Sequence, residues 1–167
     1  MNKLSAKNTE DILENFGERV VRLSKINLAT LKKNNSGSLQ KSIGFEMDVF
    51  RSGNFSFAFL MEEYGGNVDK GRKAGKGIPI NVLDEWIRTK PVRLRDLKTG
   101  AFLQKTPARM KSLSFLINRK IKEEGIKASN FFSEPFEQEF RKLPEQLVES
   151  FALDIESYLE QQLKIIK

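Results

Sequence analysis

The chain has 167 residues, a mass of 19.2 kDa, 39% hydrophobic and 31% charged residues, which is the size and composition of one folded domain. It contains neither cysteine nor histidine, which excludes disulfides, thiol nucleophiles, zinc sites built from these residues and a Ser-His-Asp triad. No apolar run approaches the roughly 20 residues of a membrane helix, and the first residues lack the apolar core of a secretory signal. We therefore expect a soluble protein made in a cytoplasm, with no membrane partner.

The net charge of +7 is distributed unevenly along the chain. Residues 1–63 are close to neutral at +1, residues 64–127 carry +10, and residues 128–167 carry −4. The positive middle suits a polyanion such as DNA, the acidic surface of a neighbouring subunit, or simply a solvated face. Composition leaves these three interpretations open.

A long amphipathic helix is predicted over about residues 9–33. Asn8 or Thr9 would cap it, and the acidic residues that follow suit the positive end of the helix dipole. Apolar residues then recur at helical spacing. They are Ile12, Phe16, Val20, Leu23, Leu28 and Leu31.

The apolar period changes to two over about residues 40–63, which predicts an antiparallel β-hairpin. Its two alternating runs, 43–49 and 55–61, are joined by a turn at Arg51–Asn54. The second run places Phe55, Phe57 and Phe59 on one face, where they could stack on bases or pack on helices. Packing in the core is the commoner role for such a ladder, and we favour it.

A basic glycine-rich loop is predicted over residues 64–78, because five glycines and four cations fall between Tyr64 and Gly77. It is not a phosphate-binding P-loop, since Gly71 lies one residue too close to Gly75 and Gly77 follows Lys76 where a hydroxyl is required. We expect the loop to be irregular and mobile, with amides and cations that could contact phosphates or an acidic partner.

Two further helices are predicted over about residues 79–90 and 107–124. Pro79 suits a first helical turn, and Thr106 followed by Pro107 is typical of a capped helix start. Gly125 would end the second helix. Between the two helices lies a basic connector with a turn, which includes Arg93 and Arg95.

The last predicted helix spans about residues 144–165 and keeps an apolar stripe at every fourth residue from Leu147 to Leu163. Residues 126–140, with four phenylalanines, are expected to be partly extended and packed. The order of helix, hairpin and helices predicts one α+β domain over residues 1–167. One hairpin is a small platform for this many helices, so part of the apolar surface is expected to meet another copy of the chain.

Two acidic fragments of the sequence are candidate catalytic groups. Asp96-Leu97-Lys98 resembles the end of a metal-dependent nuclease motif, and Glu62-Glu63 could form a carboxylate pair, but neighbouring strand residues point to opposite faces. Such fragments arise by chance in a chain this rich in charge. We therefore predict no catalytic residue, no metal site and no cofactor.

Two groups of short motifs resemble the neck or tail-completion proteins of tailed bacteriophages, most closely those of crAss-like phages of gut Bacteroidetes. The first group is Tyr64, Val68-Asp69-Lys70-Gly71-Arg72, Gly75-Lys76-Gly77-Ile78-Pro79-Ile80, Trp86-Ile87-Arg88 and Phe102-Leu103. The second is Phe115-Leu116-Ile117-Asn118-Arg119-Lys120-Ile121, Gly125-Ile126 and Asn130-Phe131-Phe132. The resemblance spans roughly residues 10–160, but it lacks the Phe-Leu-Arg-Pro-like segment that many such proteins carry near the C-terminus.

This resemblance implies a non-enzymatic virion protein of α+β fold that acts in the neck or tail, after assembly in the host cytoplasm. Copies would form a homo-oligomeric ring, with the portal or adaptor and the tail proteins as partners. The expected interaction residues are Lys70, Arg72, Lys73, Lys76, Arg93 and Arg95. The sequence leaves open whether these cations contact packaged DNA or protein, and whether the chain is instead a small nucleic-acid-binding regulator.

Overall fold

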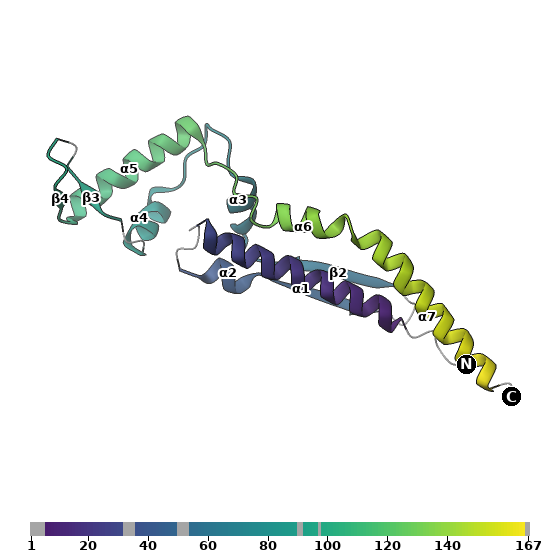
Figure 1. Cartoon of the computed structure of the whole chain (residues 1–167). Helices are drawn as coiled ribbons and strands as arrows, with labels where there is room; N and C mark the ends of the chain where they lie inside the picture. Colours follow the sequence, from purple (N-terminus) through teal and green to yellow (C-terminus); the bar gives the residue numbers. More distant parts are fainter. Residues whose placement is uncertain (1–5, 32–35, 50–53, 90–91, 97, 166–167) are drawn as a thin grey trace.

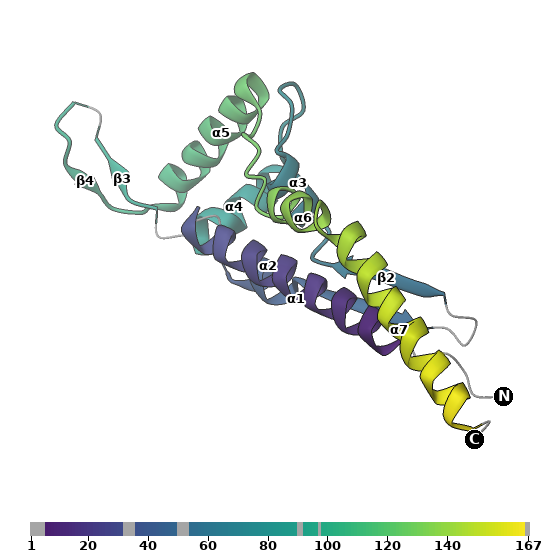
Figure 2. The same cartoon turned by 45° about the vertical axis from the view of Figure 1, so that its right-hand side comes forward.

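The computed structural model describes residues 6–31, 36–49, 54–89, 92–96 and 98–165. It has an α+β fold of elongated shape, with two parts joined end to end (Figure 1, Figure 2). The part that we call the body contains α1, α2, β1, β2, α6 and α7, and the part that we call the arm contains α4, α5, β3 and β4. The short helix α3 lies between them.

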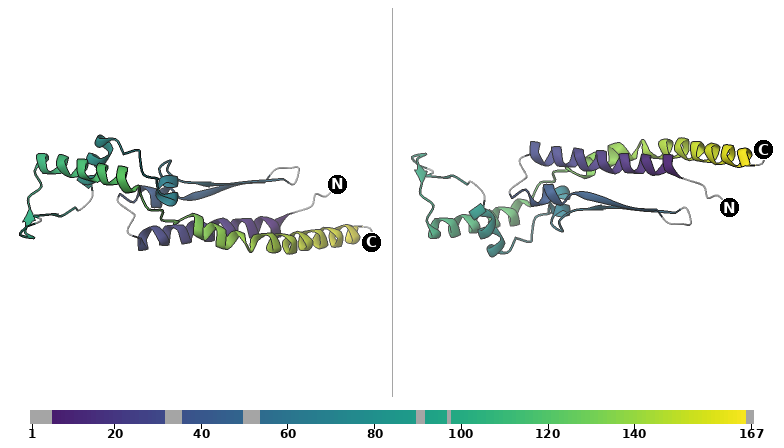
Figure 3. Two further views of the ribbon diagram at one scale, coloured as in Figure 1. Left: turned by 90° about the horizontal axis from the view of Figure 1, so that it is seen from above. Right: turned by 90° about the horizontal axis from the view of Figure 1, so that it is seen from below.

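The body is built on the long helix α1 (Lys7–Thr30). One side of α1 packs against α6 (Ser133–Phe140) and α7 (Leu143–Ile165), and another side packs against β1 (Figure 3). The residues of α1 that are buried recur at helical spacing, which is the pattern that the sequence predicts. They are Thr9, Leu13, Phe16, Gly17, Val20, Ser24 and Leu28.

The hairpin pairs β1 (Gly44–Val49) with β2 (Phe55–Leu60) in antiparallel register, with Phe45 opposite Phe59. The predicted role of its phenylalanines is confirmed, because Phe55, Phe57 and Phe59 pack against the core formed by α1 and Leu143. The turn expected at Arg51–Asn54 lies, apart from Asn54, outside the described residues.

The boundaries of α1 and of the hairpin differ from the prediction. The first helix begins at Lys7 and ends at Thr30, and its predicted basic end at Lys32-Lys33 falls outside the described residues. The segment before the hairpin forms the short helix α2 (Ser38–Ser42), so the strands begin later than expected. Neither Asn8 nor Thr9 caps α1, since both lie within the helix and the cap comes from α7.

The arm packs α4 (Ile80–Thr89) against α5 (Pro107–Glu124), with Leu83 and Ile87 buried on α4. The predicted start and end of α5 are confirmed. The Thr106 hydroxyl accepts the Arg109 N–H at 3.4 Å, and Gly125 ends the helix. Between α4 and α5, the basic connector forms a small hairpin of β3 (Leu94–Arg95) and β4 (Phe102–Leu103).

Two segments contain helices that were not predicted. Within the predicted loop 64–78, residues Gly65–Lys70 form α3. Residues 126–140, expected to be partly extended and packed, are non-helical up to residue 132 with Phe131 buried, but residues Ser133–Phe140 form α6. The two helices were missed because they are held by long-range hydrogen bonds between them, which local sequence patterns do not reveal. The described residues contain no helix long and apolar enough to cross a membrane.

Candidate functional site

The six predicted interaction residues form two separate clusters, one between body and arm and one on the arm. Four of them, Lys70, Arg72, Lys73 and Lys76, which we call the junction cations, lie beside the end of α5, and Arg93 and Arg95 lie in or next to β3, near the start of α5. The 18 residues of α5 correspond to a length of about 27 Å. The structure therefore does not bring all six together. None of the six forms an ion pair with a residue that the structure describes.

Lys70 ends α3, and the other three junction cations lie in a segment that is tied to α5. Residues 71–78, which we call the strap, follow α3 directly. Arg72 and Ile126 exchange two backbone hydrogen bonds of 2.8 Å, and the Gly75 N–H donates to the Lys122 carbonyl at 2.8 Å. The Ile78 N–H donates to Asn118 Oδ1 at 2.9 Å. The strap therefore forms neither a helix nor a strand, as expected of an irregular loop, but it is tied to the end of α5 by hydrogen bonds.

Glycine is required where the strap crosses the end of α5. Gly71 and Gly125 have φ of +71° and +78°, a conformation that residues with a side chain rarely adopt. A Cβ atom at Gly71 would meet the backbone of Ile126, and one at Gly125 would meet the backbone of Arg72. The glycines thus allow two backbone segments to approach closely.

Asp69 fixes the other side of the junction. Its side chain is 3% exposed, and Oδ1 accepts the N–H groups of Phe132 at 2.8 Å and Ser133 at 3.1 Å, where α6 begins. Its carbonyl accepts the N–H groups of Ser129 and Asn130, each at 2.9 Å. A carboxylate at the start of a helix satisfies free amides and suits the helix dipole.

The two groups of short motifs quoted from the sequence therefore meet in space. Asp69, Gly71 and Arg72 of the first group contact residues 125–133, and Ile78 contacts Asn118 of the second. These contacts are structural, since they join the body to the arm. The junction presents Lys70, Lys73 and Lys76 as exposed side chains and Arg72 as a half-buried one.

The second cluster lies at the tip of the arm, where two guanidinium groups share one aromatic ring. The Cζ atoms of Arg93 and Arg95 lie 5.6 Å and 4.6 Å from the centroid of the Phe102 ring. Arg95 and Phe102 are direct partners in the β3–β4 register. Phe102 is 58% exposed, so the cluster offers planar cations and an apolar ring at one surface.

The fragment that resembled a nuclease motif is part of the turn of this hairpin. Asp96 Oδ1 accepts the N–H groups of Lys98 and Thr99, each at 2.9 Å. The hydrogen bonds from Thr99 and Lys98 hold the pKa of the Asp96 carboxyl below its usual value. Asp96 thus stabilises the turn, and Leu97 lies outside the described residues.

The described part of the chain holds no group of three or more acidic residues that could bind a metal ion. Glu62 and Glu63 follow β2 and are exposed.

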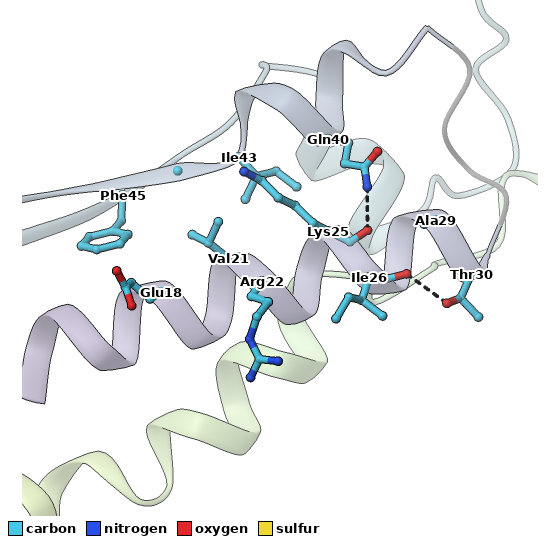
Figure 4. A pocket seen from close by; sticks show the side chains of 11 residues that line it. Glu18, Val21, Arg22, Lys25, Ile26, Ala29, Thr30, Gln40, Ile43 and Phe45 are labelled. Atoms are coloured by element: carbon cyan, nitrogen blue, oxygen red, sulfur yellow. Dashed lines mark hydrogen bonds between the residues drawn. The ribbon is translucent and has the colours of Figure 1, made fainter.

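An open groove of about 820 Å³ runs along the body between α1, α2 and the start of β1 (Figure 4). Val21, Ile43 and Phe45 give it apolar walls, while Arg22 and Lys25 add positive charge. A hydrogen bond of 3.1 Å from Gln40 Nε2 to the Lys25 carbonyl joins α2 to α1 beside it. Its lining also includes the carboxylate of Glu18.

No known protein family, curated protein or solved structure matches this chain. The evidence for a function therefore comes from the geometry of the chain and from its short sequence motifs.

Sequence reasoning missed the exposed apolar residues on the arm. Phe115 and Leu116 of α5 are 69% and 55% exposed, although they belong to one of the motifs. The helical period places Leu116 opposite Ser114, the one buried residue of α5, and Phe115 beside Leu116. The two residues were not singled out as surface residues, because the side of α5 that packs on α4 is set by tertiary contacts.

Proposed function

We propose that this chain is a non-enzymatic structural protein of a tailed bacteriophage. Copies of it form a ring in the neck that joins the portal of the head to the tail, either as connector or as tail-completion protein. The resemblance of its short motifs to neck or tail-completion proteins of tailed phages supports this proposal. The shape and surface of the chain support a role in assembly.

The observation that carries the proposal is the excess of exposed surface. The chain exposes 12439 Å², whereas a compact monomer of 19.2 kDa exposes about 8,400 Å². Large apolar side chains contribute to the exposed area at both ends of the molecule, on α5 and on α7. A chain with this much uncovered apolar surface is suited to bury it against partners.

The two cationic clusters are the candidate contacts within this assembly. The junction cations lie between body and arm, where the strap pairs with the end of α5. The tip cluster lies on the hairpin β3–β4. A ring around packaged DNA needs a lumen compatible with phosphate, and arginines suit both phosphate and carboxylate partners. Neither cluster has a described acidic partner within the chain.

The test replaces the junction cations Lys70, Arg72, Lys73 and Lys76 by serine in the phage genome. We expect the chain to fold normally, and heads and tails to accumulate without joining. The matched control replaces the exposed cations Lys7, Arg22, Lys41 and Arg141 by serine, which removes the same charge at sites away from the junction. Infectious particles in normal yield from the first variant would contradict the assignment.

The alternative function, a small DNA-binding regulator, rests on the same cations. It predicts tight binding of DNA by the isolated chain, with an affinity that falls steeply as salt rises. The neck protein is expected to show weak, nonspecific binding only. A titration of duplex DNA at several salt concentrations separates the two.

A further inference from the structure

The C-terminal half of α7 extends past the N-terminal end of α1. Asp154 accepts hydrogen bonds from Asn8 and Thr9, in the first turn of α1. Residues 155–165 of α7 therefore continue beyond that turn, toward one end of the molecule (Figure 1, Figure 3).

An apolar stripe bordered by carboxylates begins on α7 beside α1 and continues along this projecting segment. Phe151, Ile155, Leu159 and Leu163 follow one another at four-residue spacing, so they share one side of the helix, and all four are exposed. The exposed residues Glu149, Glu156 and Glu160 are separated by two helical turns and then by one, so they lie on one side of α7, beside the stripe. The side of α7 that faces α1 is different, since it contains Leu143, Ser150 and Asp154.

The exposed face of α5 has the complementary composition. By the helical period, Leu116 lies on the side of α5 opposite the buried Ser114 and Phe115 lies beside Leu116; both are exposed. Lys111 and Arg119, each four residues from Phe115, are exposed on the same side. Arg119 also forms an exposed ion pair of 3.6 Å with Glu123, a kind of pair that contributes little and that a new partner can replace.

These two surfaces lie at opposite ends of the elongated chain (Figure 1). The arm and the projecting end of α7 are separated by the whole length of the body, so the two surfaces cannot meet within one copy. They can meet between copies, and the contact is then heterologous, because one copy uses α5 and the other uses α7. Repeated heterologous contacts generate a ring when the rotation closes.

We infer that the exposed face of α5 in one copy binds the projecting stripe of α7 in the next copy. This inference rests on the proposed function, because it specifies how a ring of this chain is held together. Apolar residues fill the centre of the contact, with Phe115 and Leu116 against Phe151, Ile155 and Leu159. Lys111 and Arg119 face Glu156 and Glu160 around it.

The exposed surface is sufficient for this arrangement. A stable interface buries about 800 Å² on each partner. A ring member uses two such surfaces, or about 1,600 Å², which is less than the excess of exposed surface described above. The exposed apolar residues of α7 extend from Val148 to Leu163, which is similar in length to the 18 residues of α5.

Disulfide crosslinking tests the contact, because the chain has no cysteine of its own. Phe115→Cys and Leu159→Cys are made in separate full-length chains. Each reduced chain is oxidised by itself, and a mixture of the two reduced chains is oxidised in parallel. We expect a disulfide-linked dimer in the mixture and little in either chain alone, as a heterologous contact requires. A matched control mixes Leu159→Cys with Ser56→Cys, an exposed residue on β2. Equal crosslinking in the control mixture, or none in the first, would overturn the inference.

A charge exchange tests the same contact in solution. Glu156→Lys with Glu160→Lys should lower the association constant of the chain at least tenfold, measured by analytical ultracentrifugation, with unchanged circular dichroism. Adding Lys111→Glu with Arg119→Glu to the same chain should restore association. Loss without restoration, or no loss at all, would reject the proposed pairing of α5 with α7.

The same variants distinguish failure of this inference from failure of the proposed function. If the Glu156→Lys, Glu160→Lys chain is incorporated into infectious particles at the normal level, the neck role stands and the α5–α7 contact is wrong. If the crosslink forms but the chain is missing from complete particles, the contact is right and the neck role is wrong.

Discussion

Asp154 on α7 caps the helix that begins at the other end of the chain by binding Thr9. Asp154 Oδ2 accepts the Thr9 N–H at 3.0 Å and the Thr9 hydroxyl at 2.7 Å, while Oδ1 accepts the Asn8 N–H at 2.9 Å. Asp154 is only 2% exposed. One buried carboxylate thus supplies the cap that α1 lacks in its own sequence, and it fixes the register between α1 and α7.

Removing this cap should destabilise the body. We expect Asp154→Ala to lower the free energy of unfolding by about 2–3 kcal/mol, because buried amides and a hydroxyl lose a charged acceptor. Urea unfolding followed by circular dichroism measures the change. Ser157→Ala, at an exposed site on the same helix, is the control and should change the value by less than about 0.5 kcal/mol. Equal effects of the two variants would contradict the role of Asp154.

The same carboxylate should make stability depend on acid. Burial raises the pKa of Asp154, but hydrogen bonds from Thr9 and Asn8 outweigh it and hold the pKa below its usual value. The unfolded state then binds the proton more readily than the folded state. The stabilisation is therefore complete above about pH 4 and is lost as the pH falls below the ordinary pKa of aspartate.

Unfolding curves at a series of pH values check this sign. The difference in unfolding free energy between the natural chain and Asp154→Asn should be largest near neutral pH and should shrink in acid. A difference that grows as the pH falls would show that the pKa of Asp154 is raised in the folded chain.

Gly17 should be needed for the packing of the hairpin on α1. A Cβ atom there would lie 2.8 Å from ring atoms of both Phe45 and Phe57. Alanine favours a helix by about 1 kcal/mol over glycine, but overpacking a core costs about 1–3 kcal/mol. We expect Gly17→Ala to destabilise the chain in thermal unfolding, whereas Gly66→Ala, which meets no atom within 4 Å, should not. A higher melting temperature for Gly17→Ala would refute the close approach.

Asp69 should hold the junction between body and arm. Asp69→Ala leaves the amides of Phe132 and Ser133 without their acceptor, so we expect faster hydrogen exchange at the start of α6 and in the strap. The arm hairpin β3–β4, which has no described hydrogen bond to Asp69, serves as the internal reference. Exchange that rises equally in both regions would indicate general unfolding instead.

Sequence patterns predicted the elements that depend on local signals. The period of α1, the alternation of the hairpin and the capping sequence at Thr106-Pro107 are each set by neighbouring residues. The helices α3 and α6 were missed, because Asp69 fixes them across more than sixty positions in the sequence. Long-range hydrogen bonds of this kind leave no periodic signal.

The candidate site was predicted in composition but not in arrangement. The cations of the strap and of the connector were identified from the sequence, yet the structure separates them by the length of α5. The pairing of Arg93 and Arg95 with Phe102 depends on the register of a hairpin that was expected only as a connector with a turn. The glycine-rich sequence indicated mobility, whereas the glycines permit close contact between two backbones.

The central claim is that this chain is a structural part of the phage neck. Quantitative mass spectrometry of gradient-purified, nuclease-treated particles of a phage that encodes it tests that claim most directly. We predict that the chain is present at a low, ring-like copy number beside the portal and tail proteins. Its absence from complete particles would contradict the account and would favour an assembly factor or a regulator.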